Sequence, residues 1–102
     1  MLISARVDVI RLLADPLRAR IVEILAEGPA CTCHLVADTG AKQPRISHHL
    51  KVLREAGVVA AEPWGRFTYY RLLSEPLQAA SRQLSDLADR ARANRGASRA
   101  AG

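Results

Sequence analysis

Apolar residues recur every three or four positions through the first half of this 102-residue chain, which is the spacing of helices that bury one face. This spacing predicts a first helix over residues 5–14. A second helix follows Asp15-Pro16, because proline is favoured at the first position of a helix, and it ends at Glu27-Gly28-Pro29. The apolar positions of these two helices are Val7, Ile10 and Leu13, then Leu17, Ile21, Ile24 and Leu25.

The same periodicity predicts a short helix and a longer one around a glycine. The short helix covers residues 31–39, Gly40 ends it, and the longer helix covers residues 43–56. Two helices joined by a short glycine-bearing turn, with the second helix longer, form the helix-turn-helix pattern.

After residue 57 the pattern changes to that of a hairpin followed by a last helix. Residues 58–61 and 67–72 are rich in strand formers, and residues 63–66 between them supply the turn. The last helix runs from about residue 75 to 92. Its apolar positions are Leu77, Ala80, Leu84, Leu87 and Ala91. The predicted fold class is therefore mainly α with a small β-hairpin wing, a winged helix-turn-helix.

The length of the chain fits one domain, which we place at residues 1–93, followed by a small, polar tail at residues 94–102 that we expect to be disordered. A domain of this size buries a limited fraction of its surface, and the apolar stripe on the last helix is suited to packing along a second copy. We therefore expect a homodimer.

The charge balance and the absence of apolar runs narrow the class of protein. Lys and Arg number 15 against 10 Asp and Glu, a net charge of +5, which suits a polyphosphate partner. No stretch is apolar enough to span a membrane, and the start lacks the pattern of a signal peptide, so we expect a cytoplasmic protein with no membrane partner. In the cytoplasm a disulfide is disfavoured, so the two cysteines are expected to be free thiols. No grouping of residues suits hydrolytic catalysis.

The longer helix of the pair has one inward and one outward face. Ile46, Leu50 and Leu53 point inward, with His49 beside them. The outward residues suit DNA: Gln43 can bond to adenine, and Arg45 to guanine or phosphate. An ordinary solvated face is the alternative. We call the outward set the reading face; it consists of Gln43, Arg45, Ser47, His48 and Lys51.

The hairpin tip offers a second contact to DNA. Arg66 is placed to reach a neighbouring groove or the phosphate backbone. Trp64 is expected to pack against the protein rather than to intercalate.

Two stretches of the chain strongly resemble the ArsR/SmtB family of bacterial metal- and metalloid-responsive repressors: QPRISHHLKVLREAGVV and, after it, GRFTYYRL. The resemblance covers roughly residues 8–92. It implies a winged helix-turn-helix dimer held by its first and last helices, with residues 43–56 in the major groove and DNA released when an inducer binds. Gln43, Ser47 and His48 stand where the family motif places DNA contacts. Two such helices about 34 Å apart would meet an inverted-repeat operator.

The cysteines lie in Cys31-Thr32-Cys33-His34-Leu35, which resembles the Cys-Val-Cys-Asp-Leu element of the arsenic-sensing branch of this family. The resemblance implies that Cys31 and Cys33 bind a soft ion, trivalent arsenic or antimony. Side chains two residues apart in a regular helix point about 200° apart. Chelation is therefore expected to unwind the start of this helix. It is also expected to shift the helix over residues 43–56, which we call the recognition helix.

The sequence does not identify a third ligand for such an ion, because this chain has Val36 where the arsenic-sensing branch often has a third cysteine. His34, solvent or a small thiol are the candidates, although His34 is expected simply to face solvent. An imidazole beside two thiolates would favour zinc, cadmium or lead. Thiol oxidation is a further alternative trigger, and two buried, inert cysteines are the alternative without sensing.

Two other functions are disfavoured by the sequence. A thiol oxidoreductase would need Cys-x-x-Cys in a βαβ setting, and neither is present. Other members of the family bind metals through His and carboxylate ligands on the last helix, but residues 75–95 contain neither His nor Cys. Asp86 and Asp89 are therefore expected to lie on a solvated helix face.

Overall fold

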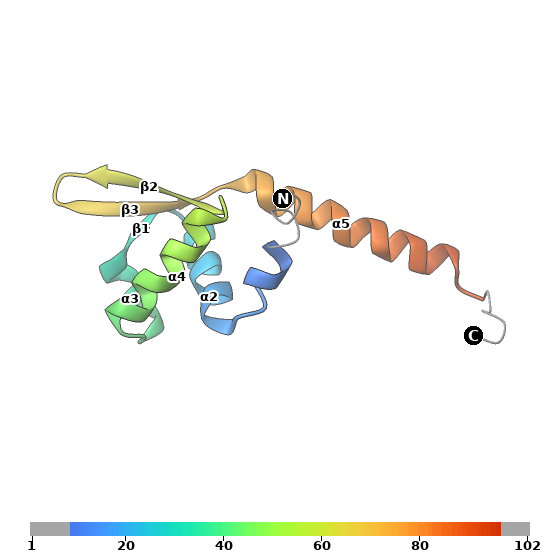
Figure 1. Ribbon diagram of the computed structural model, residues 1–102, viewed down its shortest axis with the longest axis horizontal. Helices are drawn as coiled ribbons and strands as arrows, with labels where there is room; N and C mark the ends of the chain where they lie inside the picture. The colour runs from blue at the N-terminus through green and yellow to red at the C-terminus, as the bar shows by residue number, and fades with distance from the viewer. Residues whose placement is uncertain (1–8, 97–102) are drawn as a thin grey trace.

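The computed structural model describes residues 9–96, and it confirms the predicted architecture of a mainly α-helical chain with a hairpin wing. Residues 9–12 are helical. The helices α2, α3 and α4 form the body of the molecule, the hairpin projects from it, and α5 leaves it as a long arm (Figure 1). The bounds are α2 Pro16–Ala26, β1 Ala30–Cys31, α3 Thr32–Thr39, α4 Gln43–Glu55, β2 Val59–Trp64, β3 Phe67–Leu72 and α5 Ser74–Ala93.

The N-terminal end of the described chain differs from the prediction in two respects. The helical segment ends at residue 12 rather than 14, because Asp15 caps α2 and the chain must turn to reach it. The Asp15 carboxylate accepts the N–H groups of Leu17 and Arg18 at 2.9 and 3.0 Å, and the bond from Arg18 is the main reason that the pKa of Asp15 is lowered. Ile10, expected on the inward face, is exposed in the single chain, whereas Val9 is buried. Residues 5–8 of the predicted helix, with Val7, lie outside the described residues.

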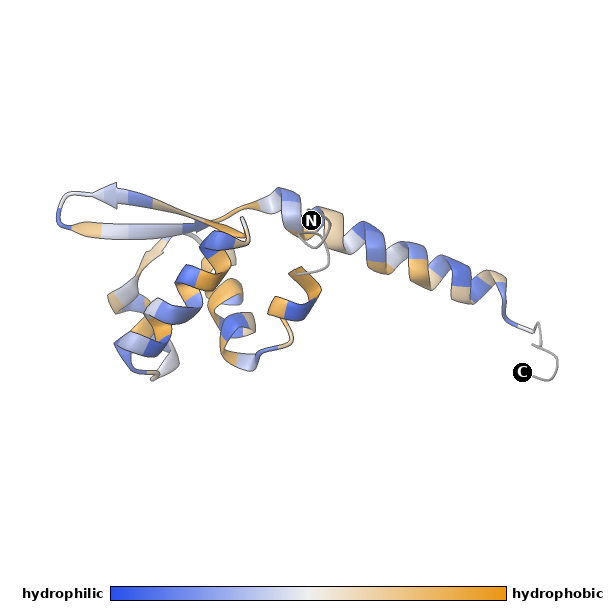
Figure 2. Ribbon diagram, viewed as in Figure 1, coloured by the Kyte–Doolittle hydropathy of each residue, from blue (hydrophilic) through white to orange (hydrophobic). Residues whose placement is uncertain are grey.

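The core lies between α2, α3, α4 and the base of the hairpin. In Figure 2 the apolar faces of these helices turn toward one another, while apolar and polar residues alternate along α5. The inward residues predicted on α4 are confirmed, and His49 beside them is 6% exposed. The largest fully buried side chains are Ile21, Leu35, Ile46, Leu50, Leu53 and Val58.

The start of the short helix was predicted wrongly. Cys31 is not helical: it has an extended backbone (φ −91°, ψ 170°), forms β1 with Ala30, and is the N-cap of α3. The two-residue β1 pairs antiparallel with β3, and Cys31 is opposite Tyr69. Sequence patterns do not predict this strand, because Ala30 pairs with Tyr70 and Cys31 with Tyr69, and no local pattern encodes so distant a partner.

Gly40 ends α3 as predicted, in the left-handed conformation (φ +76°) that joins the two helices of the pair. A Cβ at this position would meet no atom within 4 Å, so replacement by alanine costs conformational energy alone. We expect Gly40→Ala to lower the free energy of unfolding by about 1 kcal/mol, and Gly40→Asn by less, because asparagine tolerates this conformation. Urea denaturation of the three proteins measures the difference. Equal stability of Gly40→Ala and wild type would contradict this.

The sheet has the order β1-β3-β2, with both pairs antiparallel. β2 extends to Trp64, past the end predicted for it, and as an edge strand it accommodates Pro63. Trp64 pairs with Phe67 at the tip and is 73% exposed, so the prediction that it packs against the protein is wrong. The reason is that the hairpin projects beyond the helices (Figure 1).

The arm α5 closely matches the predicted last helix. Ala80 is buried, but Leu84 and Leu87 are 53% and 51% exposed in the single chain. Residues 94–96 form a turn after the helix, and the rest of the predicted tail lies outside the described residues. Within residues 9–96, no helix is long and apolar enough to cross a membrane.

Candidate thiol site and nucleic-acid interface

Three potential metal ligands meet at the N-terminus of α3. The ligand atoms of Cys31, Cys33 and His34 all lie within 4.8 Å of one another, and they form the single group of three or more such residues in the described chain. The structure joins the two cysteines as a disulfide, with Cα atoms 5.4 Å apart, where the sequence predicted free thiols. The sulfurs reach one another because Cys31 lies outside the helix. The expectation that chelation must unwind α3 is therefore wrong.

His34 is the third member of this group and lies against Cys31. Its Nδ1 accepts the backbone N–H of Cys31 at 3.4 Å and lies 3.4 Å from the Sγ of Cys31. Its ring meets that of Tyr69 edge to face, with centroids 6.2 Å apart. His34 is exposed, as predicted, but it is also part of the group.

The donor set suits soft ions. Thiolate sulfur selects soft, thiophilic ions, and an imidazole nitrogen beside it is a common ligand of zinc and related divalent metals. Cys31 is 4% exposed, whereas Cys33 and His34 are exposed, so an ion would enter from their side. Val36, at the position of the third cysteine in the arsenic-sensing branch, is partly buried against the core.

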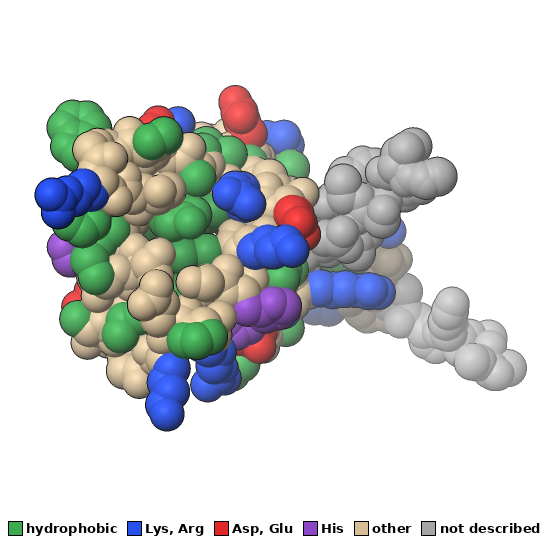
Figure 3. All heavy atoms as spheres, turned by 60° about the vertical axis from the view of Figure 1, so that its left-hand side comes forward, with side chains coloured by type: hydrophobic (Ala, Val, Ile, Leu, Met, Phe, Trp, Pro, Cys, Tyr) green, Lys and Arg blue, Asp and Glu red, His purple; other side chains and the backbone are tan. Residues whose placement is uncertain are grey.

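The reading face is exposed on α4 along its whole length, while His49, Leu50 and Leu53 on the same helix are buried. Lys42, the N-cap of α4, makes no side-chain cap bond. Pro44 carries no N–H, and the N–H of Arg45 donates to the carbonyl oxygen of Lys42 at 3.0 Å, so side chains rather than backbone N–H groups are the donors that this face offers to a phosphate. Figure 3 brings forward the end of the molecule that carries α3, α4 and the hairpin tip, and shows several Lys and Arg side chains exposed there.

Arg66 is exposed in the turn of the hairpin, as predicted. The cross-strand pair of Trp64 and Phe67 stands directly beside it, exposed on the wing. The DNA contacts of Arg66 and of the reading face remain predictions.

Sequence reasoning missed two residues around these sites. Tyr69 lies opposite Cys31, and alternation along β3 could have placed it on one face but not against His34. Arg18 bonds to His49 of α4 at 3.2 Å, a tertiary contact with no local signal. On α5, Asp86 and Asp89 are exposed and paired with Arg90 and Arg92, as expected of a solvated face.

The family model described as bacterial regulatory protein, arsR family, matches residues 15–61. The arsenic resistance transcriptional regulator ArsR2 of Pseudomonas putida is 36% identical over 91 residues, which cover 78% of this chain and 79% of the relative. The transcriptional repressor SmtB of Mycobacterium tuberculosis is 41% identical over 76 residues. The aligned residues cover 74% of this chain but 56% of SmtB.

The fold is also similar to solved structures. A crystal structure described as a possible transcriptional regulator for arsenical resistance superposes with a TM-score of 0.70 at 36% identity. The superposition covers 76% of this chain and 80% of that one.

Proposed function

Because this chain belongs to the ArsR family of bacterial regulatory proteins, a family of transcriptional regulators and not of enzymes, we propose that it is a repressor released from its operator by a thiophilic inducer. The inducer binds Cys31 and Cys33 in their reduced state. The observation that carries this proposal is the convergence of two sulfurs and an imidazole at the start of α3, directly before the recognition helix.

Trivalent arsenic, or antimony, is the first candidate inducer. The relatives ArsR2 and ArsR1 of Pseudomonas putida are named as arsenic resistance regulators. Two thiolates give arsenic two of its three bonds, and solvent or a small thiol supplies the third.

A soft divalent metal such as cadmium, lead or zinc is the second candidate, because Nδ1 of His34 lies 3.4 Å from a sulfur and would complete a set of two thiolates and one imidazole. Thiol oxidation competes with both, since the structure joins the same two sulfurs.

The route from the thiols to DNA passes through the cap of α3. Cys31 is both the N-cap of α3 and the partner of Tyr69 in the sheet, and its N–H is bonded to His34. An ion held by the sulfurs would draw Cys31, Cys33 and His34 into one coordination geometry and so displace α3. Because Leu35 of α3 and Ile46 of α4 are both fully buried in one core, α4 would move with it. Release then follows from the different affinity of the ion for the two arrangements.

On the DNA side, we propose that the reading face enters the major groove and that Arg66 contacts the adjoining backbone or groove. The partner is double-stranded DNA with an inverted repeat, bound by a homodimer in the cytoplasm. An apolar hollow between residues 9–14 and α5 supports the dimer. Leu77 and Leu84 line this hollow, and a second copy of the chain could cover it.

Fluorescence anisotropy of a labelled duplex tests this function. The duplex is taken from the DNA upstream of the gene for this chain, and the protein is reduced with a phosphine, because dithiols would compete for arsenite. We expect two chains to bind each duplex and arsenite to release it, with cadmium and zinc compared in parallel. A DNA affinity indifferent to every thiophilic ion would contradict the sensing role.

A further inference from the structure

His49 is the single buried polar side chain among the described residues, and it lies on the recognition helix directly behind the reading face. The guanidinium of Arg18 reaches it: Nη1 of Arg18 lies 3.2 Å from Nδ1 of His49. Arginine can only donate, so Nδ1 must accept and the imidazole must be neutral, with its proton on Nε2. The contact therefore depends on the protonation state of His49.

The same guanidinium binds a third element. Nε of Arg18 donates to the carbonyl oxygen of Leu12 at 3.0 Å, where the N-terminal helical segment ends. Arg18 lies in the first turn of α2, which Asp15 caps. One side chain thus connects the end of the N-terminal segment, the start of α2 and the middle of α4.

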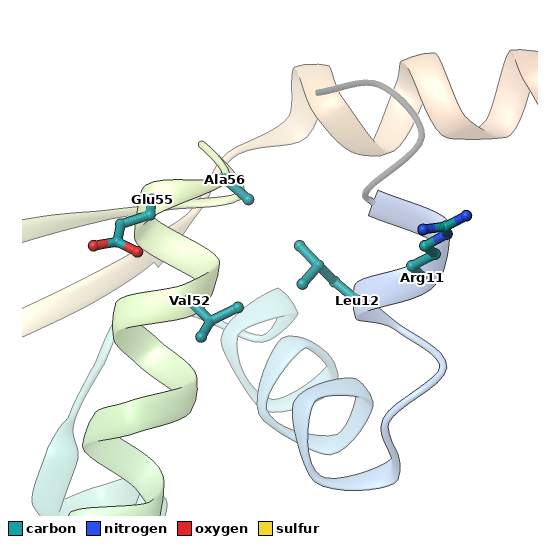
Figure 4. Close-up of a pocket in the computed structure, with 5 residues that line it drawn as sticks. All are labelled: Arg11, Leu12, Val52, Glu55 and Ala56. Carbon is teal, nitrogen blue, oxygen red and sulfur yellow. The ribbon is translucent and has the colours of Figure 1, made fainter. Parts of the chain in front are cut away.

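Apolar packing between the N-terminal segment and α4 is incomplete. Leu12 points toward Val52 of α4 and toward Ala56, the C-cap of that helix, across an open hollow of about 400 Å³ (Figure 4). Arg11 and Glu55 also line this hollow. Side chains that do not fill the space between two elements hold their relative orientation weakly. The polar bridge Leu12–Arg18–His49 supplies the directional contact that the hollow lacks.

We propose that Arg18 and His49 are positioning residues for DNA binding: their bridge holds the recognition helix in its DNA-competent orientation, and protonation of His49 breaks the bridge and weakens operator binding. Protonated His49 would place a second cation 3.2 Å from Arg18 with no acceptor left at Nδ1. This inference rests on the proposed function, in that α4 is the element that contacts DNA.

The charged groups facing His49 come from two elements. Arg45 and His48 lie on its own helix, and Asp15 and Arg18 lie at the start of α2. Burial is the largest cause that lowers the pKa of His49 below its usual 6.5; Arg18, His48 and Arg45 lower it further, against an opposing effect of Asp15. The imidazole is therefore neutral at pH 7. As the pH falls below 6.5, the unfolded chain takes up this proton before the folded chain does, so folding stability also decreases.

The bridge is tested by measuring operator affinity between about pH 7.5 and pH 5.5. Three proteins are compared: wild type, His49→Asn and His48→Asn. Asparagine at position 49 places an uncharged acceptor near the position of Nδ1. We expect His49→Asn to bind like wild type at pH 7.5 and to keep that affinity at pH 5.5. The operator affinity of wild type is expected to fall by up to about tenfold per pH unit below the pKa of His49, for each chain bound to the duplex. His48→Asn is the matched control on the exposed side of the same helix, and it should lose affinity on acidification as wild type does, because it leaves the bridge between Arg18 and His49 intact.

Two further measurements keep this test decisive if a variant is poorly folded. Proton NMR of the three histidines of the wild type reports the pKa of His49 directly, and a value at or above 6.5 would overturn the proposal. Arg18→Lys, which cannot reach both Leu12 and His49, should raise that pKa and weaken operator binding at pH 7.5. An equal loss of affinity on acidification in wild type and folded His49→Asn would also overturn it. Failure of the wild type to bind any duplex at pH 7.5 would instead refute the proposed function.

Discussion

Serine in place of both Cys31 and Cys33 is expected to leave operator affinity unchanged and to abolish release by arsenite. In the wild type, inducer binding should weaken operator affinity by roughly 5–150-fold, the usual size of coupling between two sites. The double variant should show no weakening at the same arsenite concentration, because a hydroxyl does not replace a thiolate as a ligand of soft ions. Anisotropy of the labelled duplex in reduced samples measures both quantities.

The local structure indicates that the double serine variant folds normally. Cys31 is the N-cap of α3, and serine is among the preferred residues at that position, so folding should be retained. Cys33 is exposed and tolerates a polar replacement. His34→Ala is the matched comparison: it should reduce release by cadmium or zinc more than release by arsenite if the imidazole completes a divalent site. Release by arsenite that persists in the double variant would exclude these thiols as the sensor.

Removal of Arg45 from the reading face is expected to produce the second large effect. Arg45 is exposed in the first turns of α4, where a recognition helix meets base edges. Arg45→Ala should weaken operator binding by about 1–3 kcal/mol if it bonds to a base, and the preference for the operator over unrelated duplexes should shrink with it. Lys51→Ala should instead weaken binding to all duplexes and reduce its salt dependence by about one ion.

Arg92→Ala is the control for the loss of one positive charge. Arg92 lies in the last turn of α5, at the end of the arm away from α4, and pairs with Asp89. Its loss should change operator affinity little. Equal effects of Arg45→Ala and Arg92→Ala would show that overall charge, and not the reading face, accounts for DNA binding.

The helices of this chain were predictable because each shows a local period that tertiary packing follows. The division of α4 into a buried side with Ile46 and Leu50 and an exposed reading face is the clearest case. The ends of two other helices were predictable as well, since Gly40 stands at the end of α3 and Asp15-Pro16 at the start of α2.

The parts that sequence reasoning missed all depend on distant partners. β1 exists because Ala30 and Cys31 pair with β3, and this pairing removes Cys31 from α3 and brings its sulfur to that of Cys33. Helical spacing carried back to Cys31 would instead put the two thiols on opposite sides. The bridge from Arg18 to His49 crosses 31 residues of sequence, and no periodicity encodes it.

The coupling between the thiol site and the DNA-binding face is tested most directly by a single titration that follows both sites at once. Reduced protein bound to its labelled duplex is titrated with arsenite while thiolate charge-transfer absorbance and anisotropy are recorded together. If the thiols are the sensor, both signals change in parallel and saturate at one arsenic per chain. Absorbance that saturates while the duplex stays bound, or release without the absorbance change, would contradict this coupling.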